Sequence, residues 1–244
     1  MDVEKRSIGD RLKNFLVIVW VIASTVLYSS LALITFPLNR RLARYLGACW
    51  NRQLLFVAGV RVKARGIEQL DSSKRYVFIA NHQSHIDIPV LYSTMPVNLS
   101  FIAKKELFRI PFFGWALWAL GHIWIDRSNA RKAHASINRA VSRLQNEHTS
   151  LVLFPEGTRS SDGTMGQLKQ GSFSLVLKAG VEVVPVVIHD SIRIVKKHSK
   201  KFNSGTVHVT ILPSITIDRT QTKADIAGQL QTQMVSVLEK GFTE

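Results

Sequence analysis

An uncharged apolar stretch near the N-terminus constrains this chain more than any other feature of its sequence. No charged side chain occurs between Asn14 and Asn39, and the apolar part of the stretch runs from Phe15 to Phe36. At a rise of about 1.5 Å per residue, a helix of this length matches a hydrocarbon core about 30 Å thick. We therefore expect residues 14–36 to form a helix embedded in a membrane. A cleaved signal peptide is disfavoured, because the stretch is about twice as long as a usual signal-peptide core.

Charge does not fix how this helix is oriented. Basic side chains flank it on both sides, namely Lys5, Arg6, Arg11 and Lys13 before it and Arg40, Arg41, Arg44 and Arg52 after it. With equal flanks the positive-inside rule favours neither orientation. Residues 40–56 have the pattern of a basic amphipathic helix, so a helical hairpin that dips into one leaflet fits best. A single transmembrane span is the alternative.

The charge balance of the chain points to an anionic partner. Lys and Arg number 32 against 17 Asp and Glu, which gives a formal net charge of +15. An anionic membrane surface, a phosphorylated metabolite and a nucleic acid all fit such an excess. The basic residues are spread along the chain without a recognition motif, so we expect an anionic membrane surface and no nucleic acid. One basic run, which is either solvated or attracted to anionic lipid, comprises Arg193, Lys196, Lys197, Lys200 and Lys201.

Composition and patterning narrow the fold class. With 46% hydrophobic and 20% charged residues, the chain is neither disordered nor a transporter with several spans. The single cysteine, Cys49, excludes an internal disulfide framework and a cysteine-based zinc site. We expect membrane-anchoring helices over residues 1–58 and a soluble domain over residues 59–244.

The soluble domain alternates short apolar runs with longer helical patterns, which is typical of an α/β fold. The apolar runs, each predicted to be a strand, are residues 76–80, 101–103, 122–125, 151–154, 183–188 and 207–212. Predicted helices cover residues 130–147 and the tail from residue 225.

A first polar cluster, Asn81-His82-Gln83-Ser84-His85-Ile86-Asp87, follows the first predicted strand. Its side chains lie at a strand's carboxyl end, where α/β proteins place their sites. Positions five apart on an ideal helix point about 140° apart, so His82 faces Asp87 only if His82 lies in the turn before the helix. A purely structural alternative is a capping box with Ser84 as N-cap. His85 is the weaker candidate base, because only one residue separates it from Asp87.

A second polar cluster, Phe154-Pro155-Glu156-Gly157-Thr158-Arg159-Ser160, follows another apolar strand. A glycine beside Thr, Arg and Ser offers the backbone N–H groups, hydroxyls and guanidinium that bind a phosphate. The loop is no P-loop, because the pattern G-x-x-x-x-G-K is absent. Taken alone, the loop is more simply interpreted as a surface turn, and the first cluster is what favours a phosphate site.

Together the two clusters resemble the signature motifs of glycerolipid acyltransferases, most closely the bacterial 1-acylglycerol-3-phosphate acyltransferases. The resemblance spans roughly residues 55–215 and includes the blocks at residues 104–114, 121–127 and 184–188. It implies a mixed, mostly parallel sheet flanked by helices. It also implies transfer of a fatty acyl group from acyl-CoA or acyl-carrier protein to the sn-2 hydroxyl of lysophosphatidic acid. The product would be phosphatidic acid, made without a cofactor or metal on the cytoplasmic side of a bacterial inner membrane.

The residues allow this chemistry. A hydroxyl group needs a general base, and His82 would take its proton while Asp87 holds the imidazole and stabilises the imidazolium. No G-x-S-x-G motif is present, so the hydroxyl would attack the thioester directly. By the resemblance, the phosphate site is lined by Glu156, Gly157, Thr158 and Arg159, with further cationic contacts from Arg127, Lys104 and Lys105. Glu156 would bridge a hydroxyl or orient Arg127 or Arg159. Residues 111–115 (PFFGW) fit the membrane interface, an acyl channel or a buried turn.

Other functions stay open at this point. Within the same class, the acceptor could be another lysophospholipid or a lyso-aminolipid. A metal-dependent hydrolase using His82, His85 and Asp87 is disfavoured, because three such residues give too few well-spaced ligands. A non-catalytic membrane scaffold is disfavoured because it needs neither polar cluster.

Overall fold

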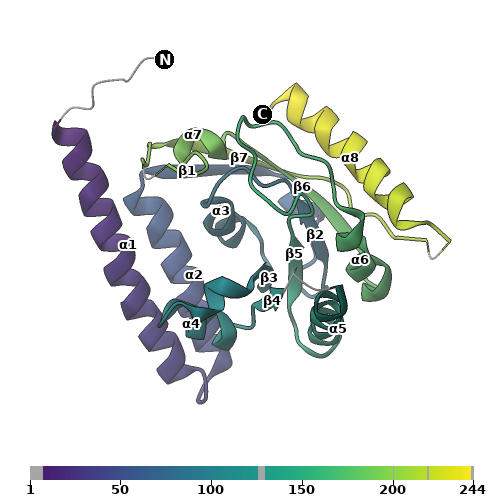
Figure 1. The fold of residues 1–244 in the computed structure, drawn as a ribbon, viewed down its shortest axis with the longest axis horizontal. Helices are drawn as coiled ribbons and strands as arrows, with labels where there is room; N and C mark the ends of the chain where they lie inside the picture. The colour runs from purple at the N-terminus through teal and green to yellow at the C-terminus, as the bar shows by residue number, and fades with distance from the viewer. Residues whose placement is uncertain (1–7, 126–129, 200, 219, 243–244) are drawn as a thin grey trace.

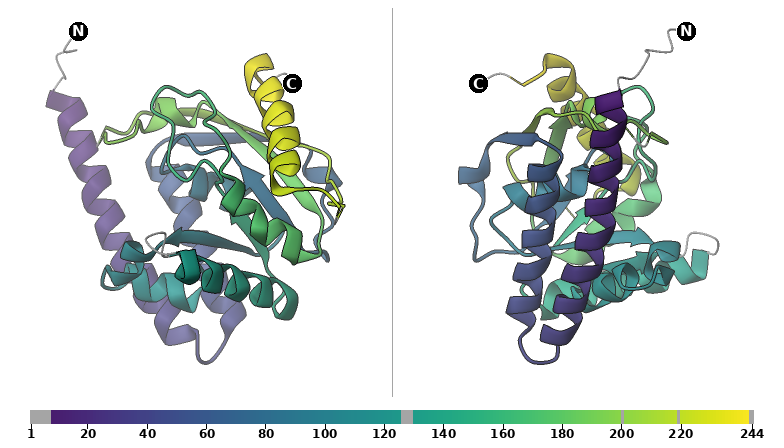
Figure 2. Two further views of the ribbon diagram at one scale, coloured as in Figure 1. Left: turned by 45° about the vertical axis from the view of Figure 1, so that its right-hand side comes forward. Right: turned by 90° about the vertical axis from the view of Figure 1, so that its left-hand side faces the viewer.

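Two helices form the N-terminal part of the chain in a computed structural model, which describes residues 8–125, 130–199, 201–218 and 220–242. α1 (Ile8–Thr35) and α2 (Arg40–Val57) lie side by side as an antiparallel pair (Figure 2). Asn39 ends the turn between them as the N-cap of α2, since its side chain accepts hydrogen bonds from the N–H groups of Arg41 and Leu42. The two helices cover the predicted ranges 14–36 and 40–56, except that α1 begins earlier and ends at Thr35.

α1 leaves most of its apolar surface uncovered. Among the described residues it is the one helix long and apolar enough to cross a membrane. Only 22% of its apolar segment, within Arg11–Thr35, is buried against the rest of the protein. Its side chains at Phe15, Ile22 and Ile34 are each more than half exposed. Gln53 of α2 accepts a hydrogen bond from Trp20 Nε1 and thereby ties the pair together. An exposed apolar surface of this extent indicates membrane association.

Seven strands form one sheet in the described part of the chain, in the order β1-β7-β6-β2-β5-β3-β4. They are β1 (Val60–Arg65), β2 (Val77–Ala80), β3 (Leu99–Lys104), β4 (Ile123–Ile125), β5 (Ser150–Leu153), β6 (Val183–His189) and β7 (Gly205–Ile211). Neighbouring strands are parallel except for β6 and β7, which are antiparallel. The predicted α/β class with a mixed, mostly parallel sheet is confirmed.

β1 is a strand that the apolar runs do not reveal. Its sequence VRVKAR alternates apolar and basic residues, and Val60 and Val62 belong to the core while Arg61 and Lys63 are exposed. β1 is one of the two edge strands of the sheet, the other being β4. An edge strand with one solvated face shows a period of two rather than a continuous apolar run.

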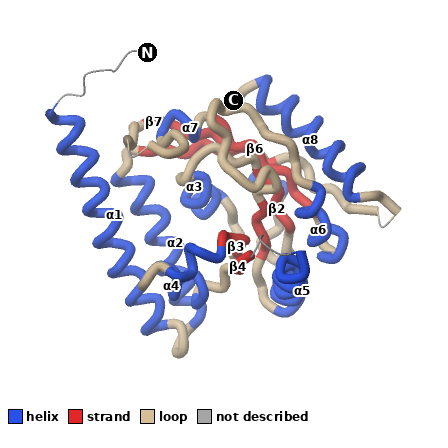
Figure 3. The backbone as a smooth tube through the Cα atoms, viewed as in Figure 1, coloured by secondary structure: helices blue, strands red, loops and turns tan. Residues whose placement is uncertain are grey.

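Helices cover both faces of the sheet (Figures 1 and 3). One face packs against α2 and α3 (Asp87–Thr94), with α1 and α4 (Phe113–Ala119) alongside. The other face packs against α5 (Ala130–Asn146), α6 (Phe173–Ala179) and α8 (Lys223–Lys240). The short elements are α7 (Ser191–Ile194) and the 3-10 turns η1 (Ile67–Gln69), η2 (Lys105–Arg109) and η3 (Gln170–Ser172).

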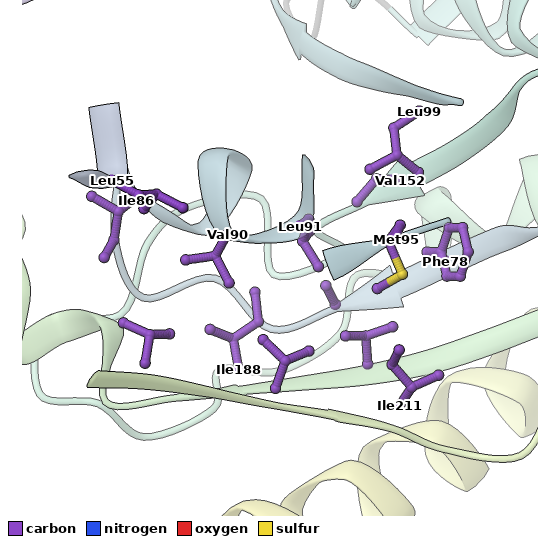
Figure 4. Close-up of a cluster of buried hydrophobic side chains, with 14 of the residues drawn as sticks. Leu55, Phe78, Ile86, Val90, Leu91, Met95, Leu99, Val152, Ile188 and Ile211 are labelled. Atoms are coloured by element: carbon purple, nitrogen blue, oxygen red, sulfur yellow. The ribbon is translucent and has the colours of Figure 1, made fainter. Parts of the chain in front are cut away.

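β2 belongs to both cores. All of its side chains are buried, and successive ones point to opposite faces of the sheet. In the core on the α3 side, Val90 and Leu91 pack near Phe78 and Ile188 (Figure 4). Full burial of each such side chain contributes about 1.5–3 kcal/mol.

The carboxyl ends of β2, β5 and β6 lie together at one edge of the sheet. Ile79 of β2 pairs with Leu153 of β5, and Ala80 of β2 pairs with Val186 of β6. The chain segments that follow these strands therefore leave the sheet side by side. Both predicted polar clusters are in these segments.

Candidate active site

The two polar clusters meet at the carboxyl edge of the sheet. His82 follows β2 and Phe154 follows β5, and the imidazole stacks on the phenyl ring with centroids 4.2 Å apart and planes 22° apart. The backbone joins the same loops, because Ser160 N–H donates to the carbonyl of His82 at 2.8 Å. Two segments about seventy residues apart in the sequence thus form one site.

His82 and Asp87 form a close pair. Nδ1 of His82 lies 2.7 Å from Oδ2 of Asp87, whose side chain is completely buried. Asp87 is the first residue of α3, and His82 lies in the turn before it, which is the arrangement needed for the two side chains to face each other. An ionised carboxylate can only accept, so the proton of the neutral ring sits on Nδ1. Nε2 keeps a free lone pair and can act as a base.

Asp87 also performs part of the capping role that its spacing from Ser84 predicts. Its Oδ2 accepts from the N–H groups of Gln83 at 2.8 Å and Ser84 at 2.9 Å. The other half of a capping box is missing, because Asp87 N–H donates to the backbone carbonyl of Ser84 at 3.4 Å and not to its hydroxyl, which donates to the carbonyl of Val195 at 2.8 Å. Ser84 is not the N-cap of α3, because the helix begins at Asp87 with Ile86 as its N-cap, but one carboxylate oxygen of Asp87 serves both the turn and the imidazole.

Asn81 anchors the turn that carries His82. Its buried amide exchanges two hydrogen bonds with the backbone of Ile188 in β6, donating from Nδ2 to the carbonyl at 2.9 Å and accepting from the N–H at 2.7 Å. The side chain thereby extends the pairing between β2 and β6 while the backbone turns away toward His82. The sequence shows an Asn directly after an apolar strand, but it does not reveal that its partner is Ile188, more than a hundred residues along the chain.

Glu156, in the loop after β5, is buried and contacts the main chain of His82. Its Oε1 accepts from His82 N–H at 2.7 Å, and its Oε2 accepts from Gly166 N–H at 2.8 Å. A Cβ at position 166 would lie 3.0 Å from Oε2, so only glycine allows this approach without a shift. Burial raises the pKa of Glu156, and the two backbone donors oppose that rise. The predicted bridge to a hydroxyl or arginine is replaced by these two backbone contacts.

Arg159 provides a cation beside the pair. Its Nη1 is buried and has no hydrogen-bond partner among the described residues. Burial lowers the pKa of Arg159, and the charge of Asp87 counteracts this effect. Gly157, two residues before it, adopts a left-handed conformation with φ of 73°, and Thr158 between them is exposed. The N–H of Gly157, which the sequence suggested for a phosphate, donates instead to the carbonyl of Phe154 at 3.0 Å. An arginine donor without a partner beside the hydroxyl of Thr158 is still suited to bind an oxyanion.

The remaining predicted cations are less closely placed. Lys104 ends β3 and is highly exposed, with its Nζ 3.7 Å from Glu106. Lys105 lies over the ring of Trp124, 5.5 Å from its centroid. Lys104 is the last residue of β3 and Lys105 follows it. β5 lies between β3 and β2, and all three strands are parallel, so both lysines lie at the same edge of the sheet as the polar clusters. Arg127 lies outside the described residues.

An apolar cavity of about 360 Å³ begins next to this site. It lies between α1, α2, α3, α4 and β3, and His85 and Ile86, in the turn between β2 and α3, line it. Phe113 of the PFFGW segment also lines it, while Phe112 and Trp115 are exposed at the surface. Sequence reasoning missed the cavity itself, because its wall comes from five separate elements. The apolar lining of the cavity is suited to a hydrocarbon chain.

A family model described as Acyltransferase matches residues 61–189 of the chain. A 1-acyl-sn-glycerol-3-phosphate acyltransferase of Saccharomyces cerevisiae is 34% identical over 207 residues, which are 83% of this chain and 68% of that protein. A protein of the same name from Salmonella typhimurium is 30% identical over 237 residues, covering 94% of this chain and 96% of that protein.

The fold is also similar to a solved structure. The 1-acyl-sn-glycerophosphate (LPA) acyltransferase PlsC from Thermotoga maritima superposes with a TM-score of 0.82 at 25% identity. The superposition covers 97% of this chain and 98% of that chain, including the N-terminal helices.

Proposed function

The chain belongs to the acyltransferase family, and from this premise we propose that it transfers a fatty acyl group to the sn-2 hydroxyl of lysophosphatidic acid, giving phosphatidic acid. The donor is a thioester, acyl-CoA or acyl-carrier protein. The observation that carries this proposal is the 2.7 Å His82–Asp87 pair beside the unpartnered guanidinium of Arg159. One group suits deprotonation of a hydroxyl, and the other suits the phosphate of the same acceptor molecule.

His82 is the general base in this proposal. Nε2 removes the proton of the acceptor hydroxyl as its oxygen attacks the thioester carbonyl carbon. The tetrahedral intermediate collapses by breaking the C–S bond, and the imidazolium returns the proton to the leaving thiolate. Asp87 holds the ring through Nδ1 and stabilises its positive charge, and Phe154 supports the ring face.

The acceptor phosphate binds at the turn after β5. It carries roughly two negative charges near neutral pH, which fit the free Nη1 of Arg159, with Gly157 and Thr158 directly before it in the same loop. Lys104 and Lys105 add positive potential along the same edge, and Arg127 is proposed as a further cationic contact. Holding the phosphate positions the neighbouring hydroxyl for attack.

The acyl chain of one substrate occupies the apolar cavity. The cavity begins at His85 and Ile86 in the catalytic turn, so a chain lying in it has its carbonyl end near the base. Burying each methylene group there stabilises the complex by about 0.8 kcal/mol.

The N-terminal helices lie in one leaflet, with the catalytic domain on the cytoplasmic side of a bacterial inner membrane. Both ends of α1 contact the domain: Asn14 Oδ1 accepts from Phe202 N–H at 2.8 Å, and the ring of Phe36, just after α1, lies 5.9 Å from that of Trp118. A helix that runs along the domain for its whole length cannot cross a bilayer unless the domain enters it too. The exposed Trp115 and Trp118 of α4 extend the apolar surface of the helix pair.

A panel of acceptors tests the proposal. Purified enzyme is incubated with acyl-CoA and, separately, lysophosphatidic acid, other lysophospholipids or a lyso-aminolipid, with and without a chelator. We expect chelator-insensitive CoA release that depends on lysophosphatidic acid, and phosphatidic acid by product mass. Arg159→Ala should raise KM for the acceptor. Release without any acceptor, or preference for an acceptor without phosphate, would contradict the proposal.

A further inference from the structure

Two buried carboxylates converge on His82. Among the described residues, Asp87 and Glu156 are the acidic side chains that are buried, and both contact the same histidine. Asp87 binds the ring at Nδ1, whereas Glu156 binds the main-chain N–H. A carboxylate is costly to bury, so two at one residue require a compensating role.

We propose that Glu156 is a positioning residue for the base and not a ligand of the acceptor. It fixes the main chain of His82 relative to the loop after β5, and its negative charge helps to stabilise the imidazolium. This inference rests on the proposed role of His82 in proton transfer.

The contacts of Glu156 support this assignment. Each of its two oxygens already accepts a backbone N–H, one from the catalytic turn and one from Gly166 in the second loop. The carboxylate therefore joins the two loops whose separation sets the distance between base and acceptor. A position error of about 1 Å in such a site can cost about 100-fold in rate.

Electrostatics argue against direct contact with the acceptor. A buried negative charge next to a phosphate that is itself doubly charged repels it, and the repulsion is strong where water is excluded. The same charge favours a cation on His82. Glu156 thus weakens acceptor binding slightly while it stabilises the charged state formed during the reaction.

Glutamine is a sharp probe of this geometry. The side chain of Glu156→Gln is almost the same size, but only one of its two terminal atoms can accept a hydrogen bond. The other is an NH₂ group that faces a backbone N–H. Glu156→Asp keeps the charge, but its shorter side chain cannot reach both donors.

The charged groups around His82 come from three segments. They are Asp87 at the start of α3, Glu156 and Arg159 in the loop after β5, and His85 in the turn of His82 itself. Without the negative charge of Glu156, less negative charge near His82 balances the charges of Arg159 and His85. The imidazole then loses its proton more readily, so the acid limb of the pH–rate profile moves to lower pH.

The experiment compares Glu156→Gln, Glu156→Asp and a matched control, Asp162→Asn, in the full-length protein with acyl-CoA and lysophosphatidic acid. Asp162 is an exposed carboxylate of the same loop, and the hydrogen bonds recorded for its side chain all use Oδ1, which an asparagine retains. The control therefore removes a nearby charge without altering those bonds.

We expect kcat of Glu156→Gln to fall about 100-fold, with no rise in KM for the acceptor and an acid limb at lower pH. Its Tm should fall by no more than about 12 °C, because an unmade buried hydrogen bond costs about 1–3 kcal/mol and each kcal/mol shifts Tm by about 2–4 °C. Glu156→Asp should lose kcat and keep the wild-type acid limb, and Asp162→Asn should match the wild type in all these measurements.

Two outcomes would overturn the inference. A raised KM for the acceptor with near-normal kcat in either Glu156 variant would make Glu156 an acceptor ligand. A large loss of Tm with an unmoved acid limb would make it a purely structural residue. If Glu156→Gln does not fold, the KM of Glu156→Asp for the acceptor decides whether Glu156 is an acceptor ligand. If the wild type shows no lysophosphatidic acid-dependent CoA release, the proposed function itself fails, which this comparison detects separately.

Discussion

His82 and His85 lie three residues apart in the same turn, yet their surroundings differ. His82 is held on three sides, by Asp87 at Nδ1, by Phe154 under the ring and by Glu156 at the main chain. His85 is exposed and lines the mouth of the cavity. A base must be oriented and have its tautomer fixed, and only His82 meets both conditions.

Replacing His82 tests this distinction directly. His82→Ala should lower lysophosphatidic acid-dependent CoA release by about 10²–10⁴-fold, the range for loss of a general base, while the protein stays folded. His85→Ala is the matched control and should keep most of the activity. Both are measured with purified protein and circular dichroism as a check on folding. Full activity in His82→Ala would end the proposal that His82 is the base.

His122 is a second histidine with a defined environment. It is buried at the start of β4, where Nδ1 accepts from Phe101 N–H at 3.1 Å and Nε2 lies 3.2 Å from the hydroxyl of Tyr92. Burial, with a smaller effect of Arg143, lowers the pKa of His122 from 6.5 to about 4. The folded state therefore holds this side chain neutral where the unfolded chain would protonate it.

The buried His122 makes the stability of the fold depend on pH. Because the unfolded state takes up the proton first, stability is lost as pH falls from about 6.5 toward 4, by about 3 kcal/mol at most. His122→Gln, which does not titrate, should show a smaller loss of the free energy of unfolding over this range. The measurement is urea unfolding in detergent at several pH values, and equal slopes for variant and wild type would refute it.

At the scale of the elements, α2 and α4 define the cavity. Gly47 of α2 faces Leu120, the C-cap of α4, and both line the cavity. A Cβ at Gly47 would lie 2.9 Å from Leu120 Cδ1. The leucine is flexible at that end, so an added methyl group displaces it rather than the helix.

Gly47→Ala should therefore shorten the acyl chain that the enzyme prefers. Each methylene that no longer fits loses about 0.8 kcal/mol, which is about fourfold in relative kcat/KM. Competition between donors of graded chain length measures the shift. Gly228→Ala on α8 is a matched control, since nothing lies within 4 Å of the added Cβ there. An unchanged chain-length profile for Gly47→Ala would place the acyl chain elsewhere.

At the scale of the whole molecule, the N-terminal helices and the catalytic domain form one apolar surface. The exposed apolar side chains of α1 continue onto α4 through Trp115 and Trp118, and α1 contacts the domain near both ends (Figure 2). Lys13, in the second turn of α1, donates to Ser204, which follows the basic run that begins at Arg193. Cations beside an apolar surface suit an anionic bilayer, where each adds about 1 kcal/mol near the surface.

Protease accessibility distinguishes the two topologies. With the enzyme in sealed vesicles and its domain facing outward, protease added outside should remove an N-terminal tag together with loops of the domain. A hairpin in one leaflet keeps the N-terminus on the side of the domain, whereas a span moves it across. A tag that is cut only after the vesicles are opened would require a single span.

Several features of the site were predictable because they are local. Asn81 through Asp87 fit within one turn, so the chain's own spacing determined that His82 could face Asp87. The α/β class also followed from local patterns, since buried parallel strands are continuous apolar runs. β1 escaped this reasoning because one of its faces is solvated.

The sequence by itself thus determined the long apolar helix near the N-terminus, the α/β pattern and the residues of the two polar clusters. Only the tertiary structure decided that Glu156 binds the main chain of His82, that Asn81 binds Ile188, and that five elements enclose a cavity. The physical reason is range. Backbone preference and side-chain periodicity act over a few residues, whereas these contacts join segments brought together by strand order in the sheet.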